Sequence, residues 1–138
     1  MKNRISNHDN WATPKEFYNA LNQEFHFDFD PCPLHHTVDG LTIEWGRKNF
    51  INPPYSCKLK EAFIRKAFEE SKKGKLCVLL LPVSTSTKIF HEVILPHAEI
   101  RFKRGRIKFL ANGEENKKYK SGQMDSMIVI FKTGPRWA

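Results

Sequence analysis

The stretch Asn49–Leu81, NFINPPYSCKLKEAFIRKAFEESKKGKLCVLLL, decides the fold class of this chain. Asn49–Asn52 predicts a short buried strand, and Leu76–Leu81 is an uninterrupted apolar run typical of a central strand. Between them, Ser56 can cap a helix that runs to about Lys73, with a glycine directly after its end. Two buried strands joined by a helix indicate an α/β domain.

Upstream, the sequence predicts one more helix and one more strand. Thr13 followed by Pro-Lys-Glu is typical of a helix start, with Thr13 as the N-cap and Glu16 completing a capping box. That helix is expected to continue through about Asn22. Phe25–Phe29 alternates strictly between aromatic and polar residues, which predicts a half-buried strand ending at Asp30-Pro31.

Downstream, helices and strands continue to alternate. A helix is expected after Ser84/Thr85, stopping at Pro96. The later segments are a hairpin over Ile100–Leu110 that turns near Gly105, a polar loop over Ala111–Gln123, and a last buried strand over Met127–Phe131. The whole pattern predicts a three-layer α/β fold with a mixed sheet, forming a single domain over residues 1–138.

Charge divides this chain of net charge +8 into two halves. Residues 1–56 hold five basic and seven acidic residues, whereas residues 57–138 hold eighteen and eight. Within Arg101–Lys120 the count is eight basic to two acidic. Such a concentration is the electrostatic footprint of a polyanionic partner, although a solvated lysine-rich surface would look the same.

The sequence also bears on the compartment. No apolar run approaches the length needed to cross a bilayer, and the N-terminus has no signal-peptide core. The three cysteines are an odd number without Cys-x-x-Cys spacing. Reduced thiols in a cytoplasmic protein are the expectation.

The tetrapeptide Asn52-Pro53-Pro54-Tyr55 has the most specific chemistry in the chain. The prolines stiffen the loop, so that the Asn52 side-chain oxygen and the Pro53 carbonyl can both accept hydrogen bonds. Two acceptors match the two N–H bonds of a planar amino group, as in adenine, cytosine or a glutamine amide. Tyr55 adds a flat ring on which a base can stack. The alternative is a plain turn after a strand.

Asp30 occupies a comparable position, because it also follows a predicted strand. Ligands of α/β folds gather at the carboxyl ends of strands. The Asp30 carboxylate can therefore accept hydrogen bonds from a ribose or an amino group of a cofactor, or it can simply cap a turn.

Several short motifs occur together in a specific order. They are Trp11-Ala-Thr13-Pro14-x-x-Phe17, Phe29-Asp30-Pro31-Cys32, Asp39-Gly40-Leu41, Trp45, Asn52-Pro-Pro-Tyr-Ser56, Leu80-Leu81-Pro82 and Gly105-Arg106-Ile107-x-Phe109. In this order they resemble the phage-type DNA N-6-adenine methyltransferase (Dam) family, over about residues 11–131.

The resemblance implies an S-adenosylmethionine-dependent enzyme that methylates adenine N6 in double-stranded DNA, encoded by a phage or prophage and acting in a bacterial cytoplasm. Asn52, Pro53, Pro54 and Tyr55 would hold the flipped adenine. The cofactor would meet Trp11 and Thr13 at its methionine end, the corner of Asp30, Pro31 and Cys32, and Asp39. Phosphates would contact the basic residues, which are Lys103, Arg104, Arg106, Lys108, Lys117 and Lys118.

The chain departs from ordinary methyltransferases in two ways. It contains no G-x-G motif, and only 22 positions separate Asp30 from Asn52. We therefore expect an abbreviated Rossmann-like fold whose cofactor cleft is small or is completed by a second subunit, as in a homodimer. A separate target-recognition domain is not expected.

Three alternatives remain open at the level of sequence. The Asn-Pro-Pro-Tyr motif is also similar to that of RNA adenine and protein glutamine methyltransferases. A module of this fold without cofactor could bind nucleic acid through the basic hairpin and through rings such as Tyr55 and Trp45. Finally, Cys32, His35 and His36 could bind a metal, although a second pair of ligands at zinc-like spacing is lacking.

Overall fold

The computed structural model describes residues 11–32, 39–54, 56–108, 110–111, 114–115 and 123–133. Its centre is a four-stranded sheet in the order β2-β3-β9-β4. The strands are β2 (Lys48–Ile51), β3 (Leu76–Pro82), β9 (Ser126–Lys132) and β4 (Glu99–Phe102). β2 and β3 are parallel, and β9 is antiparallel to both of its neighbours. The sheet is therefore mixed, as predicted.

The stretch that decides the fold class forms the expected strand, helix and strand. Helix α2 (Cys57–Lys72) connects β2 to β3, with Ser56 at its N-cap position. The helix ends before Gly74, whose φ of 90° is one that residues with a side chain rarely adopt. All but the last residue of β3 are buried, which confirms the prediction of a central strand.

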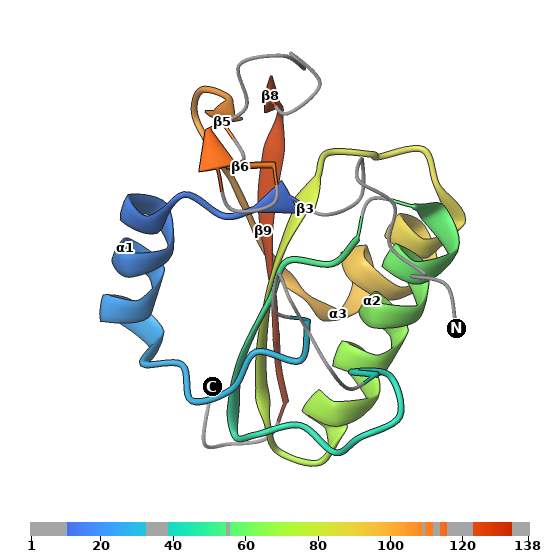
Figure 1. Ribbon diagram of the computed structural model, residues 1–138. Helices are drawn as coiled ribbons and strands as arrows, with labels where there is room; N and C mark the ends of the chain where they lie inside the picture. The colour runs from blue at the N-terminus through green and yellow to red at the C-terminus, as the bar shows by residue number, and fades with distance from the viewer. Residues whose placement is uncertain are drawn as a thin grey trace.

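Helices cover both faces of this sheet (Figure 1). On one face, helix α1 (Lys15–Phe25) packs its Leu21 into a cluster with Leu76, Val78 and Leu80 of β3. On the other face, the alternate residues of β3 pack against α2 and against the helical turn η1 (Phe90–Ile94), which α3 (Leu95–His97) follows directly. A strand covered on both faces gains from apolar residues at every position, which explains the continuous run in β3.

The predicted strand over Phe25–Phe29 is wrong. α1 continues to Phe25, and His26 ends it with a φ of 56°. The Asn22 side chain accepts a hydrogen bond from the Phe27 N–H at 2.8 Å, which stabilises this helix end. Only Phe29 pairs with the sheet, as a parallel bridge to Asn49. The aromatic alternation reflects one-sided burial of an irregular segment beside β2.

The predicted hairpin over Ile100–Leu110 is also wrong, although its turn is present at Gly105, with a φ of 78°. β4 pairs with β9, whereas β5 (Ile107–Lys108) pairs with β8 (Gln123–Met124). The C-terminal segment runs past both strands and provides a partner for each of them. This is a long-range pairing that alternation within 100–110 cannot reveal.

The predicted polar loop contains two short strands, β6 (Leu110–Ala111) and β7 (Glu114–Glu115). They form a small sheet with β1 (Trp11–Ala12), in the order β1-β6-β7. Trp11 pairs with Ala111, so the start of the described chain lies beside a segment one hundred positions later. The helix expected after Ser84/Thr85 ends at His97, one residue beyond Pro96.

The strand directions bring three strand ends together at one edge of the four-stranded sheet. β4 is antiparallel to β9, which is antiparallel to β3, so β2, β3 and β4 all run the same way. Their carboxyl ends meet at one edge, which we call the carboxyl edge. The Asn52-Pro53-Pro54-Tyr55 motif begins there, after β2, and so does the segment 103–106, after β4.

Candidate active site

Asn52 directly follows the last residue of β2, at the carboxyl edge. Its side chain is half-buried, and Pro53 and Pro54 behind it are buried. The prolines have no backbone N–H, so burying them leaves no donor unsatisfied. Pro53 and Pro54 thus form a stiff, buried connection, called the proline shelf below, between β2 and the first turn of α2. Tyr55, the remaining residue of the motif, lies outside the described residues.

Thr13 contacts the motif directly, although the two lie 39 positions apart. The Asn52 Nδ2 donates a hydrogen bond to the Thr13 Oγ1 at 3.0 Å. The prediction of Thr13 as a helix N-cap is wrong, because Pro14 occupies that position and no side chain caps the helix. The Pro14 carbonyl accepts instead from the Tyr18 N–H. The Thr13 hydroxyl is thereby available to the site rather than to the helix.

The corner formed by Asp30, Pro31 and Cys32 is compact. The Asp30 Oδ1 accepts a hydrogen bond from the Cys32 N–H at 2.9 Å, and Pro31 and Cys32 are buried. Asp30 therefore caps its own turn, as the simpler of the two interpretations predicts. A carboxylate has about four acceptor positions on two oxygens, so this role is compatible with a ligand as well.

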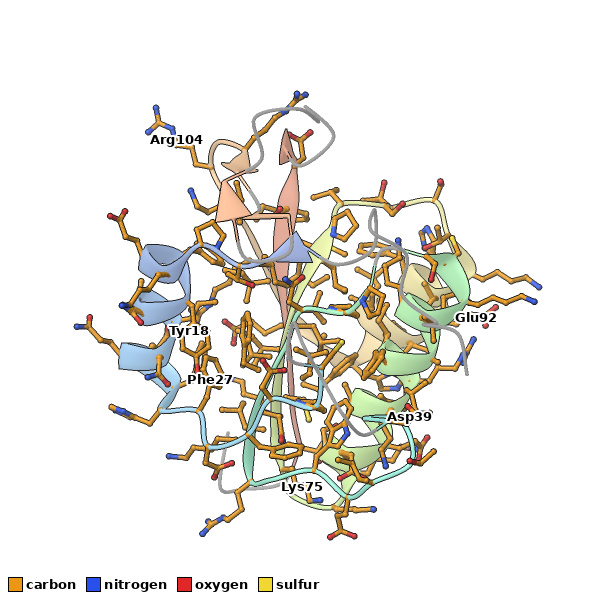
Figure 2. All side chains as sticks on the ribbon, in the orientation of Figure 1. Tyr18, Phe27, Asp39, Lys75, Glu92 and Arg104 are labelled. Atoms are coloured by element: carbon orange, nitrogen blue, oxygen red, sulfur yellow. The ribbon has the colours of Figure 1, made fainter. Side chains whose placement is uncertain are left out.

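Tyr18 lies close enough to Asp30 for the carboxylate to affect its hydroxyl. Burial raises the pKa of Tyr18, and the charge of Asp30 raises it further. The Tyr18 ring meets Phe50 of β2 edge-on, with centroids 5.0 Å apart. Figure 2 shows Tyr18 on α1 directed toward the sheet. Sequence reasoning took Tyr18 only as part of the apolar helix face, because nothing local linked it to Asp30.

Asp39 caps a second turn near this corner. Its Oδ1 accepts from the Leu41 N–H at 2.9 Å, and its carbonyl accepts from the backbone and the hydroxyl of Thr42. Gly40 lies against the Pro31 carbonyl, so closely that an added Cβ would overlap that oxygen. The turn at Asp39 and the corner at Asp30 are thus packed together, although sequence placed them nine positions apart.

A buried carboxylate that sequence reasoning missed holds this loop in place. The Glu70 side chain is 1% exposed and accepts hydrogen bonds from the Trp45 N–H at 3.1 Å and from Lys75 at 2.6 Å. Lys66 and Lys73 also bind it, at 3.2 and 2.9 Å. The Trp45 indole then donates to the Gly40 carbonyl at 2.7 Å.

The charge state of Glu70 follows from these contacts. Burial by itself would raise the pKa of Glu70, but the hydrogen bonds from Lys75, Lys73, Trp45 and Lys66 outweigh it and lower the pKa to about 2. Glu70 is therefore ionised at any ordinary pH. The sequence did contain a signal for this cluster. Lys66 and Lys73 lie four positions before and three positions after Glu70, the spacing at which side chains meet on one helix face.

The basic turn, which we define as residues 103–106, follows β4 at the carboxyl edge. Lys103, Arg104 and Arg106 are all exposed, and Figure 2 shows Arg104 projecting away from the body of the molecule. Arg106 pairs with the exposed Asp125 at 3.2 Å. For Lys108 only the backbone is described, in β5, and Lys117 and Lys118 lie outside the described residues.

Arg101 belongs to a different environment, although it is part of the same basic concentration in the sequence. Both of its terminal nitrogens bind Glu24 of α1 at 2.7 Å, and its Nε binds Glu99 at 2.8 Å. Two carboxylates neutralise this guanidinium and join β4 to α1. Arg101 is therefore a structural residue, in contrast to the turn that follows it.

Metal binding finds no support in the described residues, which contain no group of three His, Cys, Asp or Glu side chains placed to hold an ion. Cys32 is buried and forms no disulfide, whereas His35 and His36 lie outside the described residues. Cys57 and Cys77 form no disulfide either. Among the described helices, none has the length and apolar character needed to cross a membrane.

One protein family matches the chain almost from end to end. Its profile, described as DNA N-6-adenine-methyltransferase (Dam), covers residues 2–137. Comparisons with curated proteins and with solved structures returned no match. The family match extends beyond residues 11–131, over which the motifs were recognised.

Proposed function

Since the chain belongs to the DNA N-6-adenine-methyltransferase (Dam) family, we propose that it transfers the methyl group of S-adenosylmethionine to adenine N6 in double-stranded DNA. The observation that carries this proposal is the half-buried Asn52 on its proline shelf at the carboxyl edge. Ligand sites of α/β sheets lie at such edges. The fold would be an abbreviated, three-layer relative of the Rossmann-like methyltransferases.

The role of Asn52 follows from the electronic structure of its substrate. The N6 lone pair of adenine is delocalised into the ring and is a poor nucleophile. Hydrogen bonds from the two N–H groups to the Asn52 Oδ1 and the Pro53 carbonyl would draw the nitrogen toward tetrahedral geometry. These fixed acceptors stabilise the positive charge that develops on nitrogen as the methyl group arrives. Tyr55 would stack on the flipped base.

The transfer itself needs no strong base. When bound, S-adenosylmethionine supplies an electrophilic methyl group on a sulfonium. The Asn52 Oδ1 and the Pro53 carbonyl would hold N6 so that its lone pair could form the new N–C bond as the methyl group leaves sulfur, which would keep the electrons of the C–S bond. The surplus proton on N6 then leaves, and the Pro53 carbonyl and Asn52 can hold it until water accepts it.

The cofactor would contact Trp11, Thr13, Asp30, Pro31, Cys32 and Asp39. The donor set suits it, because Asp30 and Asp39 are carboxylates on closely packed turns and can accept from ribose hydroxyls or an amino group. The contact between Thr13 and Asn52 would bring the methionine end near the acceptor amide. A second subunit could complete the shortened cleft.

The test is a methyl-transfer assay with labelled S-adenosylmethionine. Unmethylated plasmid duplex, single-stranded DNA, RNA and a bacterial protein extract are offered in parallel, and methylated positions in the plasmid are mapped base by base. We expect label on adenine N6 of the duplex. Label confined to RNA or to protein would overturn the proposal, and so would failure to bind the cofactor with DNA present.

The Asn52→Ala substitution tests whether the Asn52 side chain takes part in methyl transfer. Loss of the side-chain acceptor should lower the methylation rate by about 10²-fold or more, by analogy with the loss of one oxyanion-hole donor. Asn19→Ala on the exposed face of α1 removes the same side chain away from the site and serves as the control. Equal rates for the two variants would move the chemistry away from Asn52.

A further inference from the structure

Phe102 is the most exposed large hydrophobic side chain in the described part of the chain, at 64%. It ends β4, which is an edge strand of the four-stranded sheet. Ile100, two positions earlier and on the same face of the sheet, packs against the core. The face is therefore apolar along β4, but its last ring is exposed.

Positive charge surrounds the start of the turn that follows this ring. Lys103, Arg104 and Arg106 are exposed, and the Lys103 ammonium donates to the Arg104 carbonyl, which carries no net charge. A lone exposed apolar residue is ordinary on a protein surface. An exposed aromatic ring beside exposed cations is instead the combination that binds nucleic acid, since cations meet phosphates and rings stack on bases.

The strand register places Phe102 relative to the Asn52 motif. Phe102 pairs with Met127, which pairs with Leu81, and Leu79 pairs with Ile51. β2 ends at Ile51, two residues before the level shared by Leu81 and Phe102, so the Asn52 motif begins close to that level. Three strand spacings separate the two positions, or about 14 Å across the sheet. This distance is close to the ~12 Å width of a major groove, so one duplex can contact both.

A second apolar side chain lies two residues further along the same edge. Val83, which follows β3, donates its N–H to the Asp125 carbonyl, next to the Ser126 carbonyl that accepts from the Lys103 N–H. Val83 is exposed as well. The carboxyl edge thus carries two of the three exposed large hydrophobic residues found among the described residues, together with the basic turn.

We propose that Phe102 enters the base stack of double-stranded DNA beside the position that the target base has vacated. The basic turn would hold the neighbouring phosphates, and the ring would stack on the base left without a neighbour. That a base leaves the stack, and which base it is, rest on the proposed function. Phe102 then stabilises the opened duplex, whereas Asn52 binds the base that has left it.

The test uses a duplex whose gap is already made. A fluorescent 30-base-pair duplex carries one abasic nucleotide at its centre, and an intact duplex of the same sequence is the reference. Fluorescence anisotropy gives the dissociation constant of each for the full chain. We expect the wild type to bind the abasic duplex about tenfold or more tightly than the intact one, the scale of one base stacked on a ring.

The variants distinguish base stacking by Phe102 from nonspecific hydrophobic binding to DNA. Phe102→Ala should abolish the preference for the abasic duplex, Phe102→Tyr should retain it, and Leu95→Ala should leave it unchanged. Leu95 is the matched control because its side chain is 53% exposed on α3, away from the basic turn. The slope of log affinity against log salt should stay the same in Phe102→Ala, since the ring contacts no phosphate.

Equal affinity of the wild type for the two duplexes would overturn the inference, and so would a preference that survives in Phe102→Ala. A changed salt slope in Phe102→Ala would also overturn it, by showing that the substitution acts through the basic turn. No step of this experiment reads methyl transfer. An abasic preference that depends on Phe102 therefore supports the inference even if the proposed reaction fails its own test.

Discussion

The hydrogen bond between Asn52 and Thr13 links the acceptor motif to the segment before α1. Because the Asn52 Nδ2 donates to the Thr13 hydroxyl, Thr13 holds the amide in one orientation. We expect Thr13→Val, which removes the hydroxyl at nearly constant shape, to lower the methylation rate about tenfold. Thr13→Ser should keep most of the wild-type rate, because it keeps the acceptor.

A double-mutant cycle shows whether Thr13 acts through Asn52. The Thr13→Val substitution is made in the wild type and in Asn52→Ala, whose side chain can neither donate nor accept a hydrogen bond. The effect of Thr13→Val on the single-turnover rate should be smaller in the Asn52→Ala variant than in the wild type. Additive effects of the two substitutions would mean that Thr13 acts separately from the acceptor amide.

Glu70 is the residue on which stability should depend most clearly on pH. Its pKa is about 2 in the folded chain, below the ordinary value of 4.5. A lowered folded-state pKa contributes stability that is fully present above about pH 4.5 and is lost as the pH falls toward 2. We therefore expect Glu70→Gln to lower the free energy of unfolding by about 3 kcal/mol at pH 7.

Urea unfolding of the wild type and Glu70→Gln at pH 7 and at pH 3 checks this expectation. The difference between the two proteins should be smaller at pH 3, where part of the Glu70 contribution is gone. Glu69→Gln is the control one position away, since its exposed pair with Lys72 contributes less than about 1 kcal/mol. A difference that does not change with pH would place the stabilisation in packing instead of charge.

At the scale of elements, the loop between Phe29 and β2 replaces the strands and helices that a longer chain could place there. It has no regular structure in its described residues, and it is held by contacts at both ends. The Glu70 carboxylate accepts a hydrogen bond from the Trp45 N–H near the end of the loop. The Trp45 indole in turn donates to the Gly40 carbonyl within the loop. The close approach of Gly40 to Pro31 then transmits this support to the corner at Asp30.

Gly40→Ala tests whether this packing forms the cofactor pocket. The added methyl group would overlap the Pro31 carbonyl, so the corner must shift. We expect the affinity for S-adenosylmethionine, measured by calorimetry, to fall about tenfold or more. Gly74→Ala is the control, because its Cβ meets nothing within 4 Å and its cost of about 1 kcal/mol is in backbone conformation alone. Equal cofactor affinities for the two variants would separate the corner from the cofactor.

At the scale of the whole molecule, the net charge of +8 is less informative than its distribution. Replacing Lys103, Arg104 and Arg106 by alanine should weaken DNA binding. It should also make the slope of log affinity against log salt less negative by up to about 3, since each phosphate contact contributes about 0.9. The physical reason is that fewer counterions are released from the duplex on binding.

A matched variant separates this local effect from the loss of charge as such. Arg47, Lys72 and Lys132 lie where β2 starts and where α2 and β9 end, at the opposite edge of the sheet, and are exposed. Replacing them by alanine changes the net charge by the same three units. The salt slope should then stay near that of the wild type. Equal changes in the two triple variants would contradict a specific phosphate-binding turn.

Sequence patterns predicted those elements whose signal is local. The apolar run Leu76–Leu81 and the stretch from Ser56 to the glycine after α2 became β3 and α2, because burial on both faces and helix periodicity are written in consecutive residues. The wrong prediction of a strand over Phe25–Phe29 also came from a local pattern. Its alternation reports burial on one side, but a strand needs a partner along its length, and only Phe29 has one.

The sequence by itself determined the α/β class, the mixed sheet, the family and the position of Asn52 at the end of a strand. Only the tertiary structure decided that Thr13 meets Asn52, that Glu70 supports the loop, and that Phe102 lies close to the level of the motif. The reason is physical. Helix ends, turns and apolar runs depend on neighbours in sequence. The three arrangements named here involve residues about 25 to 50 positions apart and depend on how distant segments pack and pair.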